Sequence, residues 1–460
     1  MSTQQDIMEE NYNKLRESTM FHMSLGSKEL FHSNFLHWIS IINWEAFLKI
    51  MHGLASTDEF WWEKKEILDS NQKAYHSDNL NVKVLREYHN FDLSIYIKYK
   101  EPTAEDGQDQ EDSTDEAEDM RGWIPVLILE NKMKSLPYEE QLKKYTKKAF
   151  EEWARIMKDE AIKKEPNKTL EVSGDSKNSI TFILLSLMQP NLSNYVFENP
   201  KTSERPKYTL KLHSEWKHKT YNGLLELLEY VVNNYSFEGL DKSIIKDYCN
   251  FINSLCNIAN SEDWKVNKDE NYHAKIIENR IKESKLRIAD IREKIIHERM
   301  LQILVKKLDG YDLTKKHWDK DREFKGNNVY NTGIVFYQTS FSRGKGITEA
   351  FVIINNDYRL MIQLQNDQYR RCLILHKISN DSAEQRDTRK EKILNELKNK
   401  ELWVKDRDWT EDYDPKNKFG DYFKYSYKKI GTEKTVEMVL NEMITDLNNI
   451  INFYKNINKI

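Results

Sequence analysis

The chain has 460 residues, of which 39% are hydrophobic, 12% aromatic and 32% charged. This length is enough for about two or three domains with cores of their own, and the three cysteines are too few for a disulfide framework or a cysteine-rich zinc site. No apolar run approaches the length of a membrane span or of a signal-peptide core. We therefore expect a cytoplasmic protein with reduced thiols and no membrane partner.

The net charge of −4 is distributed unevenly along the chain. Residues 101–119 contain ten acidic and no basic side chains, so the rest of the chain has a net charge of +6. A segment with so few apolar residues and so much like charge predicts a solvated acidic insertion without a packed core. The basic remainder is compatible with a nucleic-acid ligand, because phosphates bind to lysine and arginine.

The chain begins with predicted helices. The first covers Asp6–Met23, and the second covers Glu29–Ile42, in which large apolar residues recur at helical spacing and form one stripe. Helical character is expected to continue through Asn43–Asp69. Glu29 lies off the apolar stripe in the first turn of its helix, where an acidic residue is favourable for electrostatic reasons alone.

Two predicted strands follow, separated by the acidic insertion. In residues 91–99, apolar and polar side chains alternate, which places Asp92 on the polar face near the start of the strand. Val126–Leu129 is apolar throughout and predicts a central strand buried on both faces. Glu130 and Lys132 end this strand and point to the same side, because side chains alternate along a strand. If the two strands pair, these three polar residues lie close together.

A predicted helix that begins at Pro137 carries Gln141 and Tyr145 one turn apart on the same face. Five lysines lie in and just before this helix: Lys134, Lys143, Lys144, Lys147 and Lys148. We expect them to bind backbone phosphates. A solvated lysine-rich helix has the same composition, so the pattern alone leaves both interpretations open.

The predicted elements divide the chain into three parts. A further apolar strand at Ser179–Leu187 and two amphipathic helices complete an α/β domain over residues 1–270, with a mixed sheet flanked by helices. Residues 271–308 predict a charged helical connector that could also form a dimer seam. Residues 309–460 predict an α+β domain for substrate or partner binding. Within it, Ser342–Gly346 lacks the spacing of a phosphate loop, so we expect a hairpin turn there.

Asp92 and Glu130 are candidate metal ligands. Two carboxylates that converge at the edge of a sheet are hard oxygen ligands, which suit Mg²⁺ or Mn²⁺. Lys132 could orient or deprotonate a water bound there and offset developing charge, and Gln141 could hold that water or a phosphate. The structural alternative is an ordinary glutamate–lysine pair at a strand end, and the bare pattern is common enough to arise by chance.

The ordered set of these residues resembles the PD-(D/E)XK nuclease superfamily, and most of all a branch of uncharacterised bacterial proteins. The likeness is carried by residues 29–38, Asp92, Leu129–Lys132 and Gln141–Tyr145. It covers roughly Ser24–Leu187, well under half of the chain. The Glu-Asn-Lys strand end with its Gln-Leu-x-x-Tyr helix is the most specific part of the likeness.

The resemblance implies a restriction-endonuclease-like fold and a Mg²⁺-dependent phosphodiesterase, either an endonuclease or an exonuclease. Asp92 and Glu130 would bind the metal, and Lys132 would assist the attacking water. Glu29 and Gln141 would be accessory catalytic residues. Many relatives act in restriction, repair or defence against foreign DNA, which favours DNA over RNA as the substrate and antiviral defence as the role.

Other functions remain open on the sequence alone. A catalytically silent module could keep the nuclease-like scaffold and bind nucleic acid or protein, with the C-terminal domain making the contacts. A repair or recombination component could cleave only together with a motor or regulatory partner. Metal-dependent cleavage separates the nuclease from the silent module, and a repair or recombination component would cleave only with its partner.

Overall fold

The computed structural model divides the chain into two compact units, Met1–Ile258 and Ala259–Ile460. It describes residues 4–25, 28–63, 66–68, 74–76, 80–99, 120, 122–133, 142, 144–153, 180–187, 216–276, 285–308, 335–342, 345–354, 358–375, 382–403, 409–410 and 423–458. Several predicted features lie outside this description: the acidic insertion at 101–119, Lys134, Gln141, Lys143 and the side chain of Glu29. No helix in the described ranges is long and apolar enough to cross a membrane.

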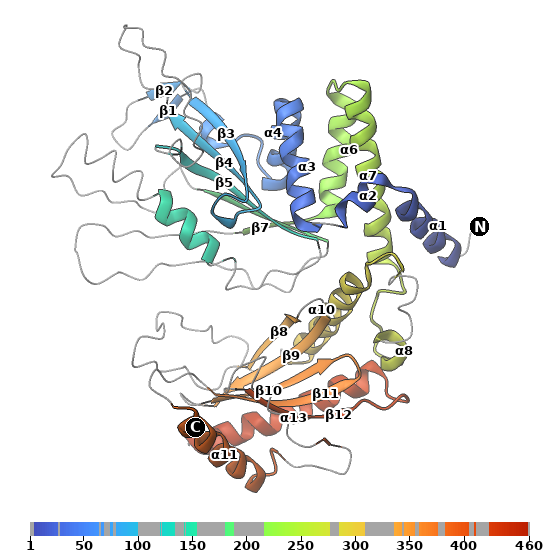
Figure 1. Cartoon of the computed structure of the whole chain (residues 1–460), viewed down its shortest axis with the longest axis vertical. Coiled ribbons are helices and arrows are strands. Elements are labelled where there is room, and N and C mark those ends of the chain that lie inside the picture. Colours follow the sequence, from blue (N-terminus) through green and yellow to red (C-terminus); the bar gives the residue numbers. More distant parts are fainter. Residues whose placement is uncertain are drawn as a thin grey trace, which may run out of the picture. The chain divides into compact units, whose positions relative to one another are not determined.

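The first unit is built on a five-stranded mixed sheet in the order β3-β4-β5-β6-β7 (Figure 1). Neighbouring strands pair antiparallel from β3 to β5 and parallel from β5 to β7. The strands are β3 (Leu80–Arg86), β4 (Leu93–Tyr99), β5 (Ile124–Lys132), β6 (Thr181–Ser186) and β7 (Trp216–Thr220). The mixed sheet confirms the α/β class predicted for this part of the chain.

Strand β5 lies at the centre of this sheet, and all 9 of its residues are buried. Its branched apolar side chains suit this position, because both faces of a central strand must be packed. Pro125 is paired with Tyr96 and has no N–H to donate to β4. The β4–β5 register shifts at this point, between Ile95 and Tyr96. From Ile95 to Leu93 the pairing is regular, so the end of β5 that bears Glu130 is held in a fixed register.

Helices cover both faces of the sheet (Figure 1). α3, α4 and α6 pack on one face, and a helix over residues 144–153 packs on the other. On that second face, the ring centroids of Phe150 and Phe182 lie 5.7 Å apart, and Trp216 Nε1 donates to Thr146 Oγ1 over 3.0 Å. The other helices of the unit are α1 (Gln4–Glu17), α2 (Thr19–Ser24), α3 (Lys28–Ile42), α4 (Trp44–Ala55), α6 (Tyr221–Asn234) and α7 (Gly239–Asn260).

The helix expected through Asn43–Asp69 is shorter than predicted. α4 ends at Ala55, because Ser56 adopts a left-handed conformation with φ 50° that caps the helix. Short strands β1 (Glu66–Leu68) and β2 (Ala74–His76) then pair as an antiparallel two-stranded sheet. Strand β7 was not expected either, because its sequence WKHKT is polar and only pairing with β6 makes it a strand.

The second unit contains a five-stranded antiparallel sheet in the order β12-β11-β10-β9-β8. β8 and β9 pair as far as Ser342 and Lys345, which confirms the predicted hairpin. The strands are β8 (Val335–Ser342), β9 (Lys345–Ile353), β10 (Tyr358–Gln365), β11 (Gln368–Leu375) and β12 (Phe423–Lys429). The helices are α8 (Tyr272–Ile276), α10 (Ala289–Leu308), α11 (Ala383–Asn399) and α13 (Val436–Asn458).

Residues 271–308, which the sequence predicted as a connector, belong to the second unit. Tyr272 in α8 and Ile296 in α10 are both part of the hydrophobic core under the antiparallel sheet. Arg287, just before α10, has a positive φ of 57°, a conformation that an uninterrupted helix does not contain. The described helices of this segment, α8 and α10, therefore pack into the core of the second unit.

Gly53 lies where α4 passes close to α6. A β-carbon at this position would be 2.2 Å from Leu227 Cδ2, whereas nothing lies within 4 Å of the corresponding position at Gly223 in α6. We expect Gly53→Ala to be less stable than Gly223→Ala by about 1–3 kcal/mol, because overpacking forces the two helices apart. Denaturant titration of both variants measures this difference, and equal stabilities would contradict it.

Candidate active site at the end of strand β5

Asp92 and Glu130 lie side by side on neighbouring strands. The antiparallel register pairs Leu93 with Leu129, so the next residues along the two strands, Asp92 and Glu130, come opposite each other. The Asp92 carboxylate is held there, because its Oδ2 accepts a hydrogen bond of 2.6 Å from the backbone N–H of Asn131. The register therefore places the two carboxylates on neighbouring chain segments at the same end of the sheet.

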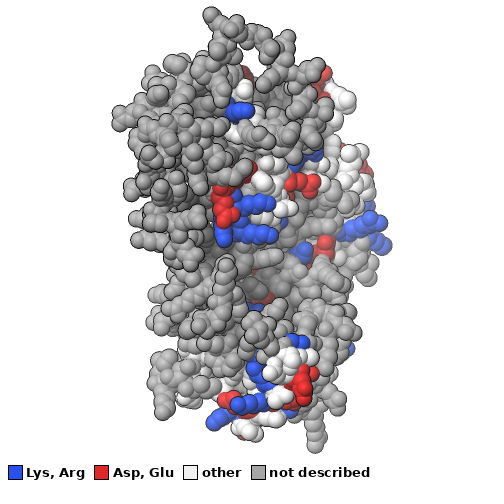
Figure 2. All heavy atoms as spheres, turned by 60° about the vertical axis from the view of Figure 1, so that its left-hand side comes forward, with Lys and Arg blue, Asp and Glu red and all other residues white. Residues whose placement is uncertain are grey.

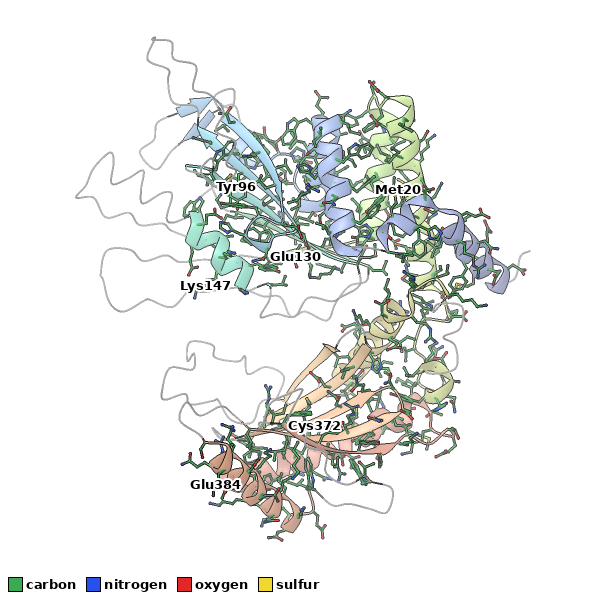
Figure 3. The ribbon with its side chains drawn as sticks, viewed as in Figure 1. Met20, Tyr96, Glu130, Lys147, Cys372 and Glu384 are labelled. Atoms are coloured by element: carbon green, nitrogen blue, oxygen red, sulfur yellow. The ribbon has the colours of Figure 1, made fainter. Side chains whose placement is uncertain are left out.

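Glu130 and Lys132 form a buried ion pair. Both side chains project from the same face of β5, and Lys132 Nζ lies 2.6 Å from Glu130 Oε1. Only 1% of the glutamate side chain and 8% of the lysine side chain are exposed. An isolated buried charge would be strongly destabilising, so each charge depends on the other for its burial. Figure 3 labels Glu130 at this end of the sheet.

Asn131 points to the opposite face of the sheet and anchors the helices there. Its Oδ1 accepts a hydrogen bond from Tyr221 OH at the start of α6. The ring of Tyr221 meets the ring of His32 from α3 edge-on, with centroids 5.2 Å apart. His32 Nδ1 in turn lies 2.7 Å from Tyr248 OH in α7. These contacts link the end of β5 to three helices.

His32 is uncharged in the folded protein, because burial lowers its pKa from 6.5 to about 3. Neither His32 nor Tyr221 was a candidate on the sequence alone. The sequence shows His32 as a histidine inside an aromatic-rich apolar helix. This pattern more often indicates a hydrogen-bonded core residue than a metal or substrate ligand. The structure assigns His32 to that core role.

Ser186 and His218 lie on the sheet face that carries Glu130 and Lys132. The parallel register pairs Lys132 with Ser186, and His218 projects from the same face of the next strand. Ser186 is fully buried, and its Oγ lies 2.7 Å from His218 Nε2. Burial, with a smaller contribution from the charge of Lys219, lowers the pKa of His218 from 6.5 to about 4. Ser186 lies in the predicted strand Ser179–Leu187, but its partner His218 comes from β7, which was not predicted, so no local pattern pointed to this pair.

The described lysines of the predicted phosphate-binding group lie on the 144–153 helix (Figure 3 labels Lys147). Lys144 is exposed, and Lys147 is 51% exposed with its Nζ 3.9 Å from Glu151 Oε1. Lys148 is half-buried and donates to the backbone carbonyl of His89 over 2.9 Å. In Figure 2, basic atoms lie next to acidic ones rather than forming a purely basic face. Lys144 and Lys147 are thus the described lysines best placed for a ligand.

The described part of the chain contains no group of three or more histidine, cysteine, aspartate or glutamate side chains that could hold a metal ion. Asp92 and Glu130 would supply two carboxylates from neighbouring strands. Mg²⁺ fits such a donor set, because it keeps several water ligands and uses one or two carboxylates. Zinc does not fit, since it takes three or four protein ligands that include nitrogen or sulfur.

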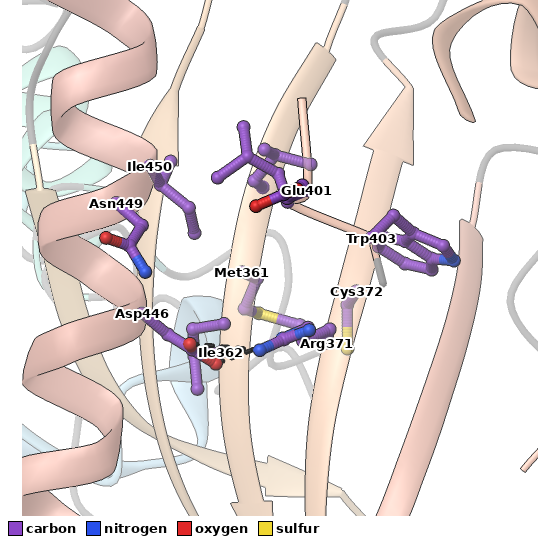
Figure 4. A pocket seen from close by; sticks show the side chains of 11 residues that line it. Met361, Ile362, Arg371, Cys372, Glu401, Trp403, Asp446, Asn449 and Ile450 are labelled. Carbon is purple, nitrogen blue, oxygen red and sulfur yellow. Dashed lines mark hydrogen bonds and ion pairs between the residues drawn. The ribbon is translucent and has the colours of Figure 1, made fainter. Parts of the chain in front are cut away.

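A small pocket in the second unit lies against α13 and the sheet (Figure 4). Its polar centre is the pair of Arg371 and Asp446, in which Nε and one terminal nitrogen of the guanidinium each lie 3.0 Å from a carboxylate oxygen. The cavity has a volume of about 30 Å³, which is room for only a few water molecules. This pocket is too small for a nucleotide, so the end of β5 is the stronger candidate site.

No family model, curated protein or solved structure matches the chain. The likeness to the nuclease superfamily therefore rests on the motif residues of the sequence. A functional proposal has to depend on those residues and on their placement in the sheet.

The neutral state of His32 makes stability depend on pH. Between pH 6.5 and about 3 the unfolded chain binds a proton at this histidine and the folded protein does not, so the free energy of unfolding falls as pH falls. We expect wild type to lose up to about 1.4 kcal/mol per pH unit relative to His32→Gln, which cannot take up that proton. Denaturant titrations at pH 7.5, 6 and 5 measure the difference, with the exposed His22→Gln as control.

Proposed function

We propose that the chain is a Mg²⁺- or Mn²⁺-dependent nuclease of the PD-(D/E)XK superfamily, with a restriction-endonuclease-like first unit, that hydrolyses phosphodiester bonds in DNA. The observation that carries this proposal is the placement of Asp92 and Glu130 at the same end of a mixed sheet, with Lys132 in contact with Glu130. Two carboxylates and one amine supply the charge and the hydrogen bonding that metal-assisted hydrolysis needs. Their order along the chain is that of the superfamily motif.

Each residue has a distinct role in this proposal. When bound, Mg²⁺ would polarise the scissile phosphate and lower the pKa of a bound water. Asp92 and Glu130 would hold the ion, and Lys132 Nζ would orient the attacking water and offset charge that develops on the phosphate. Glu29 and Gln141 are proposed as accessory residues on the sequence motif alone.

DNA is the proposed substrate, and defence against foreign DNA is the proposed role. The charge of +6 outside the acidic insertion supports a polyanionic ligand, as do the exposed Lys144 and Lys147. Phosphate contacts of this kind position a duplex without reading its sequence. RNA has the same backbone charge, so an RNA substrate belongs in the same assay.

A catalytically silent module that binds nucleic acid or protein is the second candidate. The observation that favours it is the Glu130–Lys132 pair, which is already closed at 2.6 Å and buried. A pair of this kind can serve the fold alone, because removal of either partner would leave an uncompensated charge. The metal-dependent nuclease proposed here must bind a divalent cation at Glu130, whereas a silent module need not.

Substitutions at Glu130 and Lys132 separate these candidates. Glu130→Ala should abolish cleavage and weaken Mg²⁺ binding, because it removes a metal ligand. Lys132→Ala should abolish cleavage but keep or raise Mg²⁺ affinity, because it removes a positive charge beside the ion. Cleavage of linear, circular and single-stranded DNA and of RNA is measured with Mg²⁺ and Mn²⁺, with Lys246→Ala on the exposed face of α7 as control. Wild-type cleavage by Lys132→Ala would show that the site is wrongly assigned.

The free energy of unfolding tests the metal site without an activity assay. Without metal, Lys132→Ala should lose about 3–5 kcal/mol of unfolding free energy, because a buried glutamate is left without its charge partner. Mg²⁺ should restore more stability to this variant than to wild type, since the cation replaces the lost lysine charge. A silent module would show the loss without the restoration.

The two exposed lysines provide a test of DNA binding. Lys144→Glu combined with Lys147→Glu should weaken binding and reduce the slope of log K against log salt by about 0.9 for each phosphate that the variant no longer neutralises. Lys246→Glu reverses one positive charge on the opposite side of the sheet, half the charge change of the double variant, and should have little effect. Fluorescence anisotropy at several salt concentrations measures both. An unchanged slope in the double variant would place DNA elsewhere on the protein.

A further inference from the structure

Ser186 is the residue paired with Lys132 on the neighbouring parallel strand. Paired residues of adjacent strands project from the same face, with their β-carbons about 5 Å apart. The side chains of Ser186 and Lys132 therefore leave neighbouring backbone positions on the sheet face that carries the proposed active site. Ser186 is fully buried, so its hydroxyl must find its partners inside the protein.

His218 determines the orientation of the Ser186 hydroxyl. Its Nε2 lies 2.7 Å from Ser186 Oγ, and the lowered pKa keeps the ring uncharged at neutral pH. In the tautomer protonated at Nδ1, Nε2 of the uncharged ring accepts a hydrogen bond from the Ser186 hydroxyl. The lone pairs of Ser186 Oγ are then directed away from the ring, where an ammonium group can donate to them.

We propose that the Ser186 hydroxyl, oriented by His218, is a second acceptor that positions the Lys132 ammonium beside Glu130. An ammonium has three N–H donors, and Glu130 Oε1 accepts one of them at 2.6 Å. A lysine side chain has a flexible four-carbon stem, so a further acceptor narrows the directions that its ammonium group can take. Ser186 and His218 are thus positioning residues. This inference rests on the proposed nuclease function for its consequence in catalysis, but the positioning itself is a separate claim.

Paired variants test each residue. Ser186→Ala removes the acceptor and Ser186→Thr keeps it, while His218→Leu removes the partner ring nitrogen and His218→Gln keeps a polar acceptor. We expect Ser186→Ala and His218→Leu to lower kcat by about ten- to a hundredfold, the size expected for a lost hydrogen bond to a charged group, with KM for DNA and Mg²⁺ affinity unchanged. The Thr and Gln variants should recover most of kcat. Ser426→Ala, at another buried strand serine, is the control for a purely structural loss.

Chemical labelling of Lys132 gives a readout that does not depend on cleavage. Brief acylation followed by peptide mass spectrometry should label Lys132 several-fold faster in Ser186→Ala than in wild type or Ser186→Thr, because a released ammonium samples more solvent and more of its rotamers. Thermal unfolding of each variant shows that the folded protein is being labelled. The Lys132→Ala variant identifies the peptide.

The outcomes separate the two proposals. If wild type cleaves DNA and Ser186→Ala matches it in kcat and in Lys132 labelling, the positioning role is overturned. If no metal or substrate gives cleavage but Ser186→Ala alone exposes Lys132 to the reagent, the nuclease proposal fails and the positioning claim stands. If Ser186→Ala and Ser426→Ala lose stability equally and Lys132 labelling is unchanged, Ser186 serves packing only and the inference is wrong.

Discussion

The first unit depends on an ion pair at the end of its fully buried central strand, where Lys132 Nζ lies 2.6 Å from Glu130 Oε1. Neither Glu130 nor Lys132 could be buried alone, because the desolvation of a single charge would exceed what the surrounding packing provides. Their pairing lets the polar end of β5 stay inside the fold. A cation at Glu130 would meet the same electrostatic requirement, so one arrangement can support both a stable fold and metal chemistry.

The strand end is held from its other face as well. Asn131 accepts a hydrogen bond from the Tyr221 hydroxyl. The Tyr221 ring packs against His32, which is hydrogen-bonded to Tyr248. Because His32 is buried and neutral, this chain of contacts brings no second charge into the core. The backbone N–H of Asn131 also holds Asp92. Asn131, the residue between the two charged side chains, thus holds Asp92 through its backbone and Tyr221 through its side chain.

Several elements could be predicted from the sequence because their signals are local. The apolar run of β5, the alternating pattern of β4 and the apolar stripe of α3 each follow from the spacing of a few residues. A capping box at Ser382 and Gln385 marks the start of α11 in the same way. Alternation along β5 likewise determined that Glu130 and Lys132 share a face.

The sequence by itself thus determined that β5 is a strand and that Glu130 and Lys132 lie on one face at its end. The tertiary structure decided which residues of other strands and helices contact that end of β5. β7 is polar and becomes a strand only by pairing with β6, so the contact of His218 with Ser186 has no local signal. His32 and Tyr248 are 216 positions apart and meet only when α3 packs on α7. Local spacing dictates backbone conformation, whereas partners distant in sequence are selected by burial and hydrogen bonding in the folded core.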